Sequence, residues 1–182
     1  MSNLVPVRKN TREIHLCIDF RNLNKVSLKG NHRLPKMDHI LQRVVGSSRM
    51  SFLDGYSGYN QILVHKDDRL KTTFTTPWGT FMYAKMPFGL SNARAYFYWA
   101  MDIAFTNERD VFMVIYLYDL IVFYKSDEDH LHHLRIFFQK CRKFGISFNP
   151  KKSLFSMEEG KLLGHIISKD GIHIDLVRVQ AI

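Results

Sequence analysis

The sequence is poor in cysteine and has no long apolar run. Cys17 and Cys141 are the two cysteines among 182 residues, they lie far apart, and no C-x-x-C pair is present. These absences exclude a disulfide framework and a cysteine-based zinc site, and they indicate reduced thiols in an intracellular protein. No apolar stretch reaches the roughly 20 residues that span a bilayer, and no signal-peptide pattern opens the chain. We therefore expect no membrane partner.

Internal repeats and low-complexity tracts are also missing, and the chain is not acidic. Apolar residues make up 46% of it, which is enough for a folded core and excludes a disordered chain. Lys and Arg outnumber Asp and Glu by 26 to 17, giving a net charge of +9. A basic protein of this kind favours a polyanionic partner, with nucleic acid as the first candidate.

Apolar patterning predicts strands and helices in irregular alternation. We expect strands at 13–20 and 49–54, two strands joined at Pro77-Trp78-Gly79, a hairpin over 111–124, and strands on either side of a Lys-Asp-Gly turn at 169–171. We expect helices at 35–46, at 91–105, and from about 127 to 145. Hairpins among helices favour an α+β fold with a mainly antiparallel sheet and helices on one side.

Two carboxylates stand at expected strand ends. Asp54 closes one strand and Asp119 lies at the tip of the hairpin. A single Asp in such a place is more often a solvated turn residue. Brought side by side in one sheet, however, the two could hold Mg²⁺, which prefers oxygen ligands, and two such ions support the chemistry of polymerases. Spacing alone leaves both interpretations open.

The sequence segments around these carboxylates resemble those of a known family. In chain order they read CIDFRNLNKV, LPKMDHILQRV, SFLDGYSGYNQI, TTFTTPWGTFMYAKMPFGLSNA, YLYDLIVF, DHLHHLRIFFQKCRKFGISFNPKK and KLLGHIISKDGI. From about residue 5 to 182 the sequence resembles the reverse transcriptase domain of gypsy-type LTR retrotransposon polyproteins. The resemblance implies a right-hand polymerase fold, with fingers mainly at 1–48 and 65–90 and a palm mainly at 49–64 and 91–182. We expect the thumb, RNase H and integrase parts to be absent from this chain.

The resemblance also implies roles for individual residues. Asp54 and Asp119 fall on metal-binding positions. Tyr59 falls on the position that excludes a 2′-hydroxyl; a core aromatic is the alternative interpretation, and the motif favours the exclusion role. The second motif places Phe88 and Gly89 at a loop that cradles the template base and nucleotide, although a packed helix-start loop is equally compatible. The implied nucleotide-binding residues are Arg8, Lys9, Gly55, Tyr56, Ser57, Gly58, Tyr59, Phe88 and Gly89. The implied primer-binding residues are Leu163, Gly164 and His165.

Departures from the family pattern fall on important positions. The family hairpin reads Tyr-x-Asp-Asp, but here Tyr118 stands where the first Asp, an indispensable metal ligand, is expected. A phenol is neutral near pH 7 and bulkier than a carboxylate, so we expect catalysis to be lost or severely impaired. Further departures are His15, Arg94, Tyr98, Trp99 and Leu176.

Two clusters of charged or titratable residues invite other interpretations. We do not expect His130, His132 and His133 to bind metal, because they lie on a charge-rich helix without a matching acid or cysteine frame. Lys151 and Lys152 are interpreted as a solvated basic face near nucleic acid.

The sequence therefore predicts an RNA-directed DNA polymerase domain that uses two Mg²⁺ ions, an RNA or DNA template with its primer, and deoxynucleoside triphosphates. The alternative is a catalytically inactive relic that binds nucleic acid as a pseudoenzyme. A small RNA-binding sheet domain is a more distant alternative, because its exposed-aromatic signature is not seen. The oligomeric state is not predicted.

Overall fold

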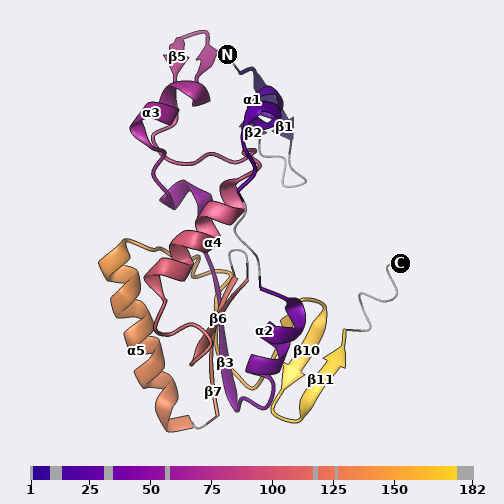
Figure 1. Cartoon of the computed structure of the whole chain (residues 1–182). Helices are drawn as coiled ribbons and strands as arrows, with labels where there is room; N and C mark the ends of the chain where they lie inside the picture. The colour runs from indigo at the N-terminus through magenta and orange to yellow at the C-terminus, as the bar shows by residue number, and fades with distance from the viewer. Residues whose placement is uncertain are drawn as a thin grey trace. The chain divides into compact units, whose positions relative to one another are not determined.

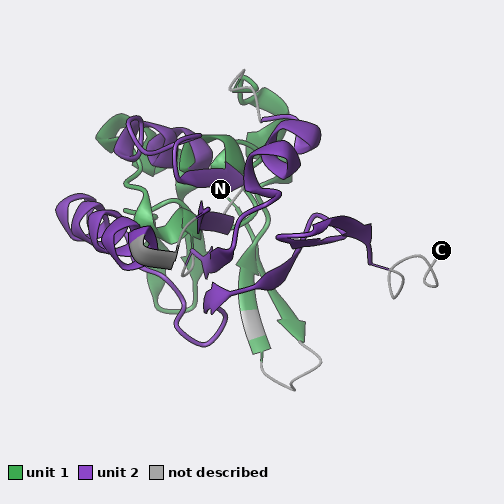
Figure 2. Cartoon of the chain, turned by 90° about the horizontal axis from the view of Figure 1, so that it is seen from below, with its two compact units in different colours: residues 1–32, 57–97 green, residues 33–56, 98–182 purple. Residues whose placement is uncertain are grey.

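The computed structural model describes residues 2–8, 14–30, 35–55, 58–116, 119–125 and 127–175. The chain divides into two compact units (Figure 2). One comprises Met1–His32 and Ser57–Phe97, and the other comprises Arg33–Tyr56 and Tyr98–Ile182. No helix in the described ranges is both long and apolar enough to cross a membrane.

The second unit is built on a four-stranded antiparallel sheet. Its strands are β6 (Met113–Tyr116), β7 (Asp119–Tyr124), β3 (Arg49–Asp54) and β8 (Leu154–Met157), in the order β6-β7-β3-β8. β3 and β7 pair without interruption from Arg49↔Tyr124 to Asp54↔Asp119. Because side chains alternate along a strand, Met50, Phe52 and Asp54 point to one face of this sheet, and Ser51 and Leu53 to the other.

The first face of the sheet carries a hydrophobic cluster with α2 (Met37–Val44). Helix α2 contributes Ile40, Leu41 and Val44, which pack on Met50, Val114, Ile121 and Phe123 of the sheet. Leu162 and Ile167 join this cluster from a second sheet of three strands, β9 (Glu159–Leu162), β10 (His165–Ser168) and β11 (Gly171–Ile174). The cluster thus ties the three-stranded sheet and α2 to the face on which Asp54 lies.

The opposite face of the four-stranded sheet packs against α5 (Asp127–Phe144). Figure 1 shows α5 on one side of the sheet and α2 with β10 and β11 on the other. The rings of Phe105 and Phe137 stack at 5.2 Å, and Cys141 is buried on the same helix. Phe105 follows directly on α4 (Ala93–Ala104), the helix within which the boundary of the two units falls.

The first unit contains two hairpins and several short helices. Strands β1 (Leu4–Arg8) and β2 (Ile14–Ile18) form one hairpin, and β4 (Phe74–Thr76) and β5 (Gly79–Phe81) form the other. The short helices are α1 (Arg21–Val26), α3 (Lys66–Arg69) and the 3-10 turns η1 (Gly58–Gln61) and η2 (Leu70–Thr72).

Two asparagines clamp distant segments of this first unit together. The Asn24 side chain donates to Gly89 O at 2.7 Å and accepts from Ser91 N at 2.9 Å. The Asn92 side chain donates to Leu28 O and accepts from Gly30 N. Each amide uses a donor and an acceptor on the backbone of the other segment, so the loop before α4 is held against residues 24–30.

The predicted α+β architecture with an antiparallel sheet is confirmed, but the expectation of helices on one side is wrong, because α2 packs on one face of the four-stranded sheet and α5 on the other. The expected strand at 49–54, the hairpin over 111–124 and the long helix after residue 126 form as predicted. Strands β1 and β8 and helix α1 were not predicted. The division into fingers and palm stays a prediction.

Candidate functional site

The two predicted metal-binding carboxylates lie opposite each other. Asp54 and Asp119 form the last register pair between β3 and β7. Directly opposed residues share one face of a sheet, with Cβ atoms about 5 Å apart. Burial raises the pKa of the Asp119 carboxyl, and the negative charge of Asp54 raises it further, while Lys152 opposes the shift. Folding therefore brings two carboxylates, 65 residues apart in sequence, into one electrostatically coupled pair.

This carboxylate pair opens onto a cavity of about 510 Å³. Besides the two carboxylates, its lining comes from β3, β8, β9, the β9–β10 turn and β10. The lining side chains include Phe52, Lys152, Leu154, Leu163 and Ile166. Gly160 of β9 packs closely on Phe52: a Cβ at position 160 would come within 2.1 Å of the Phe52 ring, which would have to move. The lining combines apolar side chains with the charged residues Asp54, Asp119, Lys152, Glu159 and Lys161.

Lys152 is a site residue that was not predicted in this role. Its Nζ lies 3.8 Å from Asp54 Oδ2, and its side chain is 67% exposed against 23% for Asp54. The turn that carries it is fastened to the backbone of Asp54: Asn149 N donates to Asp54 O at 2.9 Å, and Asp54 N donates to Ser153 Oγ at 3.4 Å. These contacts join residues about 95 positions apart, so no local sequence signal reveals them.

The predicted primer-binding residues form the turn between β9 and β10. Leu162 pairs with His165, so Leu163 and Gly164 are a two-residue hairpin loop. Both have positive φ, 54° and 84°, as a type I′ turn requires. Such a backbone is strained for leucine and free of strain for glycine. His165 Nδ1 lies 3.2 Å from Leu163 O. Leu163 lines the same cavity as Asp54 and Asp119, so the structure brings part of the predicted primer site together with the carboxylates.

Several predicted nucleotide-binding residues belong to the other compact unit. These are Arg8, Gly58, Tyr59, Phe88 and Gly89. Tyr59 is buried, and its ring meets that of Phe88 edge-on at 5.3 Å. Gly89 has a φ of 95°, a conformation that favours glycine, and its carbonyl is held by Asn24. Arg8 is exposed at the end of β1. The roles of these residues at the nucleotide remain a prediction.

Comparison with known proteins supplies the family. The profile described as reverse transcriptase (RNA-dependent DNA polymerase) matches residues 6–167. The chain belongs to the reverse transcriptase family. It is 32% identical over 167 residues to the retrovirus-related Pol polyprotein from transposon gypsy of Drosophila melanogaster, covering 92% of this chain and 16% of the relative. It is 30% identical over 177 residues to that from transposon 297 of the same organism, covering 97% of this chain and 17% of the relative.

Solved structures share the fold of this reverse transcriptase domain. The foamy viral protease-reverse transcriptase in complex with double-stranded DNA has a TM-score of 0.87 and 22% identity, with 100% of this chain and 32% of that chain covered. The same type of protein in complex with an RNA/DNA hybrid has a TM-score of 0.83 and 22% identity, with 95% and 23% covered. The expected right-hand polymerase fold is thereby confirmed.

The carboxylate pair of this reverse transcriptase domain fits a divalent cation. Two carboxylates lie opposite each other at an open cavity, and burial and, after it, repulsion by the charge of Asp54 raise the pKa of Asp119. A hard divalent cation is the ligand that relieves such repulsion. Among the residues that the structure describes, no group of three or more His, Cys, Asp or Glu side chains is placed to hold a metal ion. The carboxylates that the structure places together here are therefore Asp54 and Asp119.

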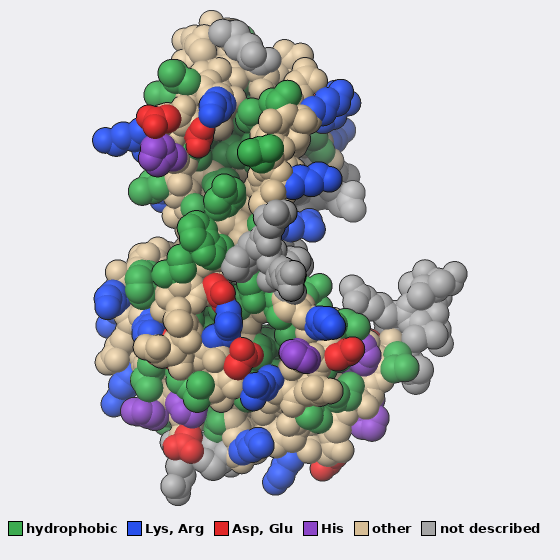
Figure 3. Space-filling model, viewed as in Figure 1, with side chains coloured by type: hydrophobic (Ala, Val, Ile, Leu, Met, Phe, Trp, Pro, Cys, Tyr) green, Lys and Arg blue, Asp and Glu red, His purple; other side chains and the backbone are tan. Residues whose placement is uncertain are grey.

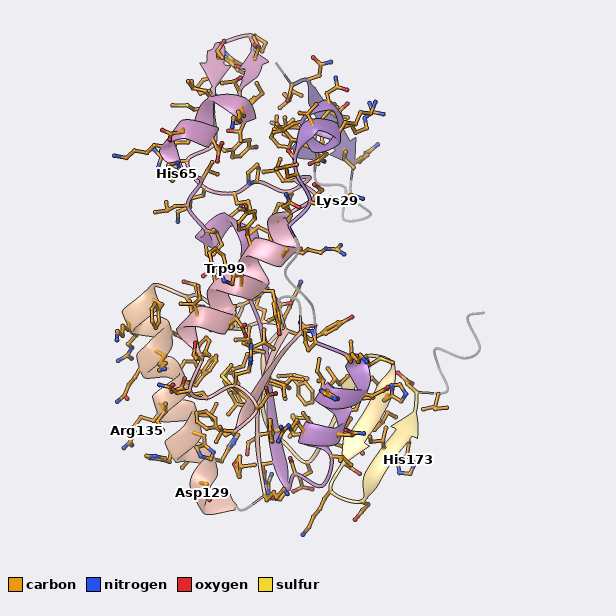
Figure 4. The ribbon with its side chains drawn as sticks, in the orientation of Figure 1. Lys29, His65, Trp99, Asp129, Arg135 and His173 are labelled. Atoms are coloured by element: carbon orange, nitrogen blue, oxygen red, sulfur yellow. The ribbon has the colours of Figure 1, made fainter. Side chains whose placement is uncertain are left out.

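The histidine cluster lies on the other face of the sheet. His130 is buried, and its Nε2 lies 3.1 Å from Ser51 Oγ. Ser51 and Asp54 point to opposite faces of β3. His130, which contacts Ser51, therefore does not face the carboxylate cavity. Figure 4 labels Asp129 and Arg135 on α5, the helix that carries the three histidines.

Some predicted residues lie outside the described residues. These are Lys9, Tyr56, Ser57 and Tyr118. Gly55 is described: it is buried and forms an isolated antiparallel bridge with Phe148, next to the turn that carries Lys152. The identity of residue 118 is known from the sequence alone, and it stands directly before Asp119.

Proposed function

We propose that this chain is the fingers and palm of an RNA-directed DNA polymerase whose metal site is impaired by Tyr118. The observation that carries the proposal is the register pair Asp54↔Asp119 at the end of β3 and β7. In a polymerase, a site of this kind holds Mg²⁺ between strand-end carboxylates and the substrate phosphates. The pair explains why a hydrophobic hairpin presents an acidic tip.

The residues of this chain have distinct tasks in the proposed reaction. Asp54 and Asp119 would hold the cation, which when bound supplies Lewis acidity to the primer hydroxyl and the nucleotide phosphates. The Leu163–Gly164 turn and His165 position the primer end beside the carboxylates. Tyr59 blocks a ribose 2′-hydroxyl, and the loop at Phe88 and Gly89 supports the nucleotide. Rigid hydrogen bonds such as Asn24 to Gly89 support positioning of this kind.

Tyr118 removes one negative charge from the tip that carries Asp119. A tyrosine hydroxyl has a reference pKa of about 10 and stays neutral at pH 7. Loss of a direct metal ligand weakens stabilisation of the transition state, and about 1.4 kcal/mol corresponds to a tenfold loss of rate. We expect the unmodified chain to be slower than the Tyr118→Asp variant by at least about 100-fold.

The proposed partners are an RNA or DNA template with its primer, and deoxynucleoside triphosphates. Support comes from the net charge of +9 and from the foamy viral proteins, which were solved with an RNA/DNA hybrid and with double-stranded DNA. Figure 3 shows Lys and Arg side chains spread over the displayed face of both units. A basic surface of this kind binds the phosphate backbone in a salt-dependent way.

A second candidate function is nucleic-acid binding without catalysis. Tyr118 favours it, because a fold that keeps its basic surface but loses a metal ligand retains binding more readily than chemistry. In this case affinity for primer-template duplex would fall steeply with salt and would not change when Tyr118 is replaced by Asp.

Primer extension with Mg²⁺ tests the proposed function. The variants are the chain as it stands, Tyr118→Asp, Tyr118→Phe as the matched control, and Tyr118→Asp combined with Asp54→Asn. We expect extension by Tyr118→Asp alone. Equal extension by the unmodified chain contradicts the impairment. Extension by none of them contradicts the polymerase function and leaves the binding protein.

A further inference from the structure

We propose that Lys152 is the resident counter-ion of the Asp54–Asp119 pair and competes with divalent cations for it. The inference rests on the proposed function in so far as it concerns the same carboxylates. It assigns Lys152 a role in the metal-free protein, where its ammonium group neutralises Asp54 and a divalent cation must displace it.

The position of Lys152 is fixed by the backbone of its partner. Asn149 N donates to Asp54 O, and Asp54 N donates to Ser153 Oγ, so the turn 149–153 is fastened to the end of β3 from both sides. The turn is also closed internally, because Ser153 Oγ donates to Asn149 O at 2.8 Å and Lys151 N donates to Asn149 Oδ1 at 3.1 Å. The backbone at position 152 therefore lies next to Asp54, regardless of the conformation of the lysine side chain.

The charge of Lys152 reaches both carboxylates. Its Nζ lies 3.8 Å from Asp54 Oδ2, and Lys152 lines the same cavity as Asp54 and Asp119. Two carboxylates and one ammonium leave a formal charge of −1 at this end of the cavity. A site with so little negative charge attracts a dication weakly, since coulombic attraction scales with the charge of the site.

The Lys152 side chain can also move away from Asp54. It is 67% exposed, lines the cavity rather than filling it, and carries four rotatable methylenes. An exposed ion pair of this kind is weak, so a cation can replace it. Lys151, its neighbour in the same turn, is exposed and does not line the cavity. The two lysines, interpreted together from the sequence as one solvated basic face, therefore have different surroundings.

Isothermal titration calorimetry with Mn²⁺ as the probe tests the proposal. The proteins are the chain as it stands, Lys152→Gln, Lys152→Arg, Lys151→Gln as the matched control, and Lys152→Gln combined with Asp54→Asn. We expect Lys152→Gln to bind Mn²⁺ about three- to tenfold more tightly, because its carboxylates lose their competitor. Lys152→Arg keeps the charge and should remain near the unmodified chain, as should Lys151→Gln.

Three results overturn the proposal. Unchanged or weaker Mn²⁺ binding by Lys152→Gln shows that the Lys152 ammonium group does not compete with the cation. Absence of Mn²⁺ binding by every variant shows that Lys152 is not what limits binding. Equal tightening by Lys151→Gln shows a general effect of net charge. Tightening that persists with Asp54→Asn places the cation elsewhere. None of these readings depends on catalysis, so a failure of primer extension and a failure of the counter-ion are distinguished.

Discussion

The two faces of the four-stranded sheet place polar residues in opposite surroundings. On the face shared with α2, Asp54 and Asp119 are charged, open to a cavity and paired with an exposed lysine. On the face shared with α5, Ser51, Tyr124 and His130 are buried, and the imidazole lies tilted against the tyrosine ring with the ring centroids 4.5 Å apart. By alternation, strands β3 and β7 supply Asp54 and Asp119 to one face and Ser51 and Tyr124 to the other, whereas His130 comes from α5.

The difference shows where this fold tolerates unbalanced charge. Burial lowers the pKa of His130 and of His133, so both imidazoles stay neutral inside the α5 face. Burial raises the pKa of Asp119 on the cavity face, but there the carboxylate remains within reach of solvent and cations. A structural role explains the first set, whereas the second set costs stability and calls for a functional explanation.

The largest expected effect concerns packing on the α5 face. Phe137 is fully buried and stacks on Phe105, while its neighbour Phe138 is 37% exposed. Phe137→Ala should lower the free energy of unfolding by about 3–5 kcal/mol, and Phe138→Ala by about 1 kcal/mol or less. Urea unfolding of the two variants measures this. Similar losses for both would show that α5 does not pack through Phe137.

The next effect concerns the wall of the cavity. Gly160→Ala places a methyl group within 2.1 Å of the Phe52 ring and should destabilise the protein by about 1–3 kcal/mol. Gly30→Ala is the control, because its Cβ would meet its nearest neighbour at 3.8 Å. Thermal unfolding compares them. A neutral Gly160→Ala would mean that Phe52 moves freely and that the wall is not rigid.

The buried histidines predict a stability that depends on pH. His130 and His133 bind protons less readily when folded than when unfolded, where the pKa is near the usual 6.5. Their neutral forms therefore favour the folded state above about pH 6.5, and this contribution is lost as pH falls through the lowered folded pKa values.

Besides each other, the groups that act on these imidazoles are Arg49, Asp129 and His132. Urea unfolding between pH 7 and pH 5 should show a flatter dependence for His130→Gln than for the unmodified chain. His173→Gln, which replaces an exposed histidine of β11, should keep the original slope. Identical slopes for the two variants would show that burial of His130 does not set the pH dependence.

The smallest expected effect returns to the cavity face. The raised pKa of Asp119 means that its charged form opposes folding at neutral pH, and this cost disappears as pH falls through the raised value. Asp119→Asn should therefore stabilise the metal-free protein by about 0.5–1 kcal/mol at pH 7. Asp170→Asn, in the exposed turn between β10 and β11, should change nothing. Thermal unfolding in EDTA measures this difference. A destabilised Asp119→Asn variant would contradict repulsion between Asp54 and Asp119.

Local patterns predicted the elements that carry the carboxylates. Apolar runs around Asp119 and before Asp54 indicated strands, and family resemblance indicated that they meet. Strand β1 was missed because Pro6 and mostly exposed residues leave no alternation to recognise. Helix α1 was missed because it is six residues long and has no capping side chain. The pairing of Lys152 with Asp54 and the clamp from Asn24 to Gly89 depend on tertiary contacts that no window of sequence contains.

The most direct test of the central claim is an anomalous difference map from crystals soaked in Mn²⁺. The claim is that Asp54 and Asp119 are the two described ligands of a cation site to which residue 118 once contributed. For Tyr118→Asp we predict a peak bonded to both carboxylates, and for the unmodified chain a weaker peak or none. A strong peak bonded to both carboxylates in the unmodified chain, or a peak away from both in the variant, would contradict the account.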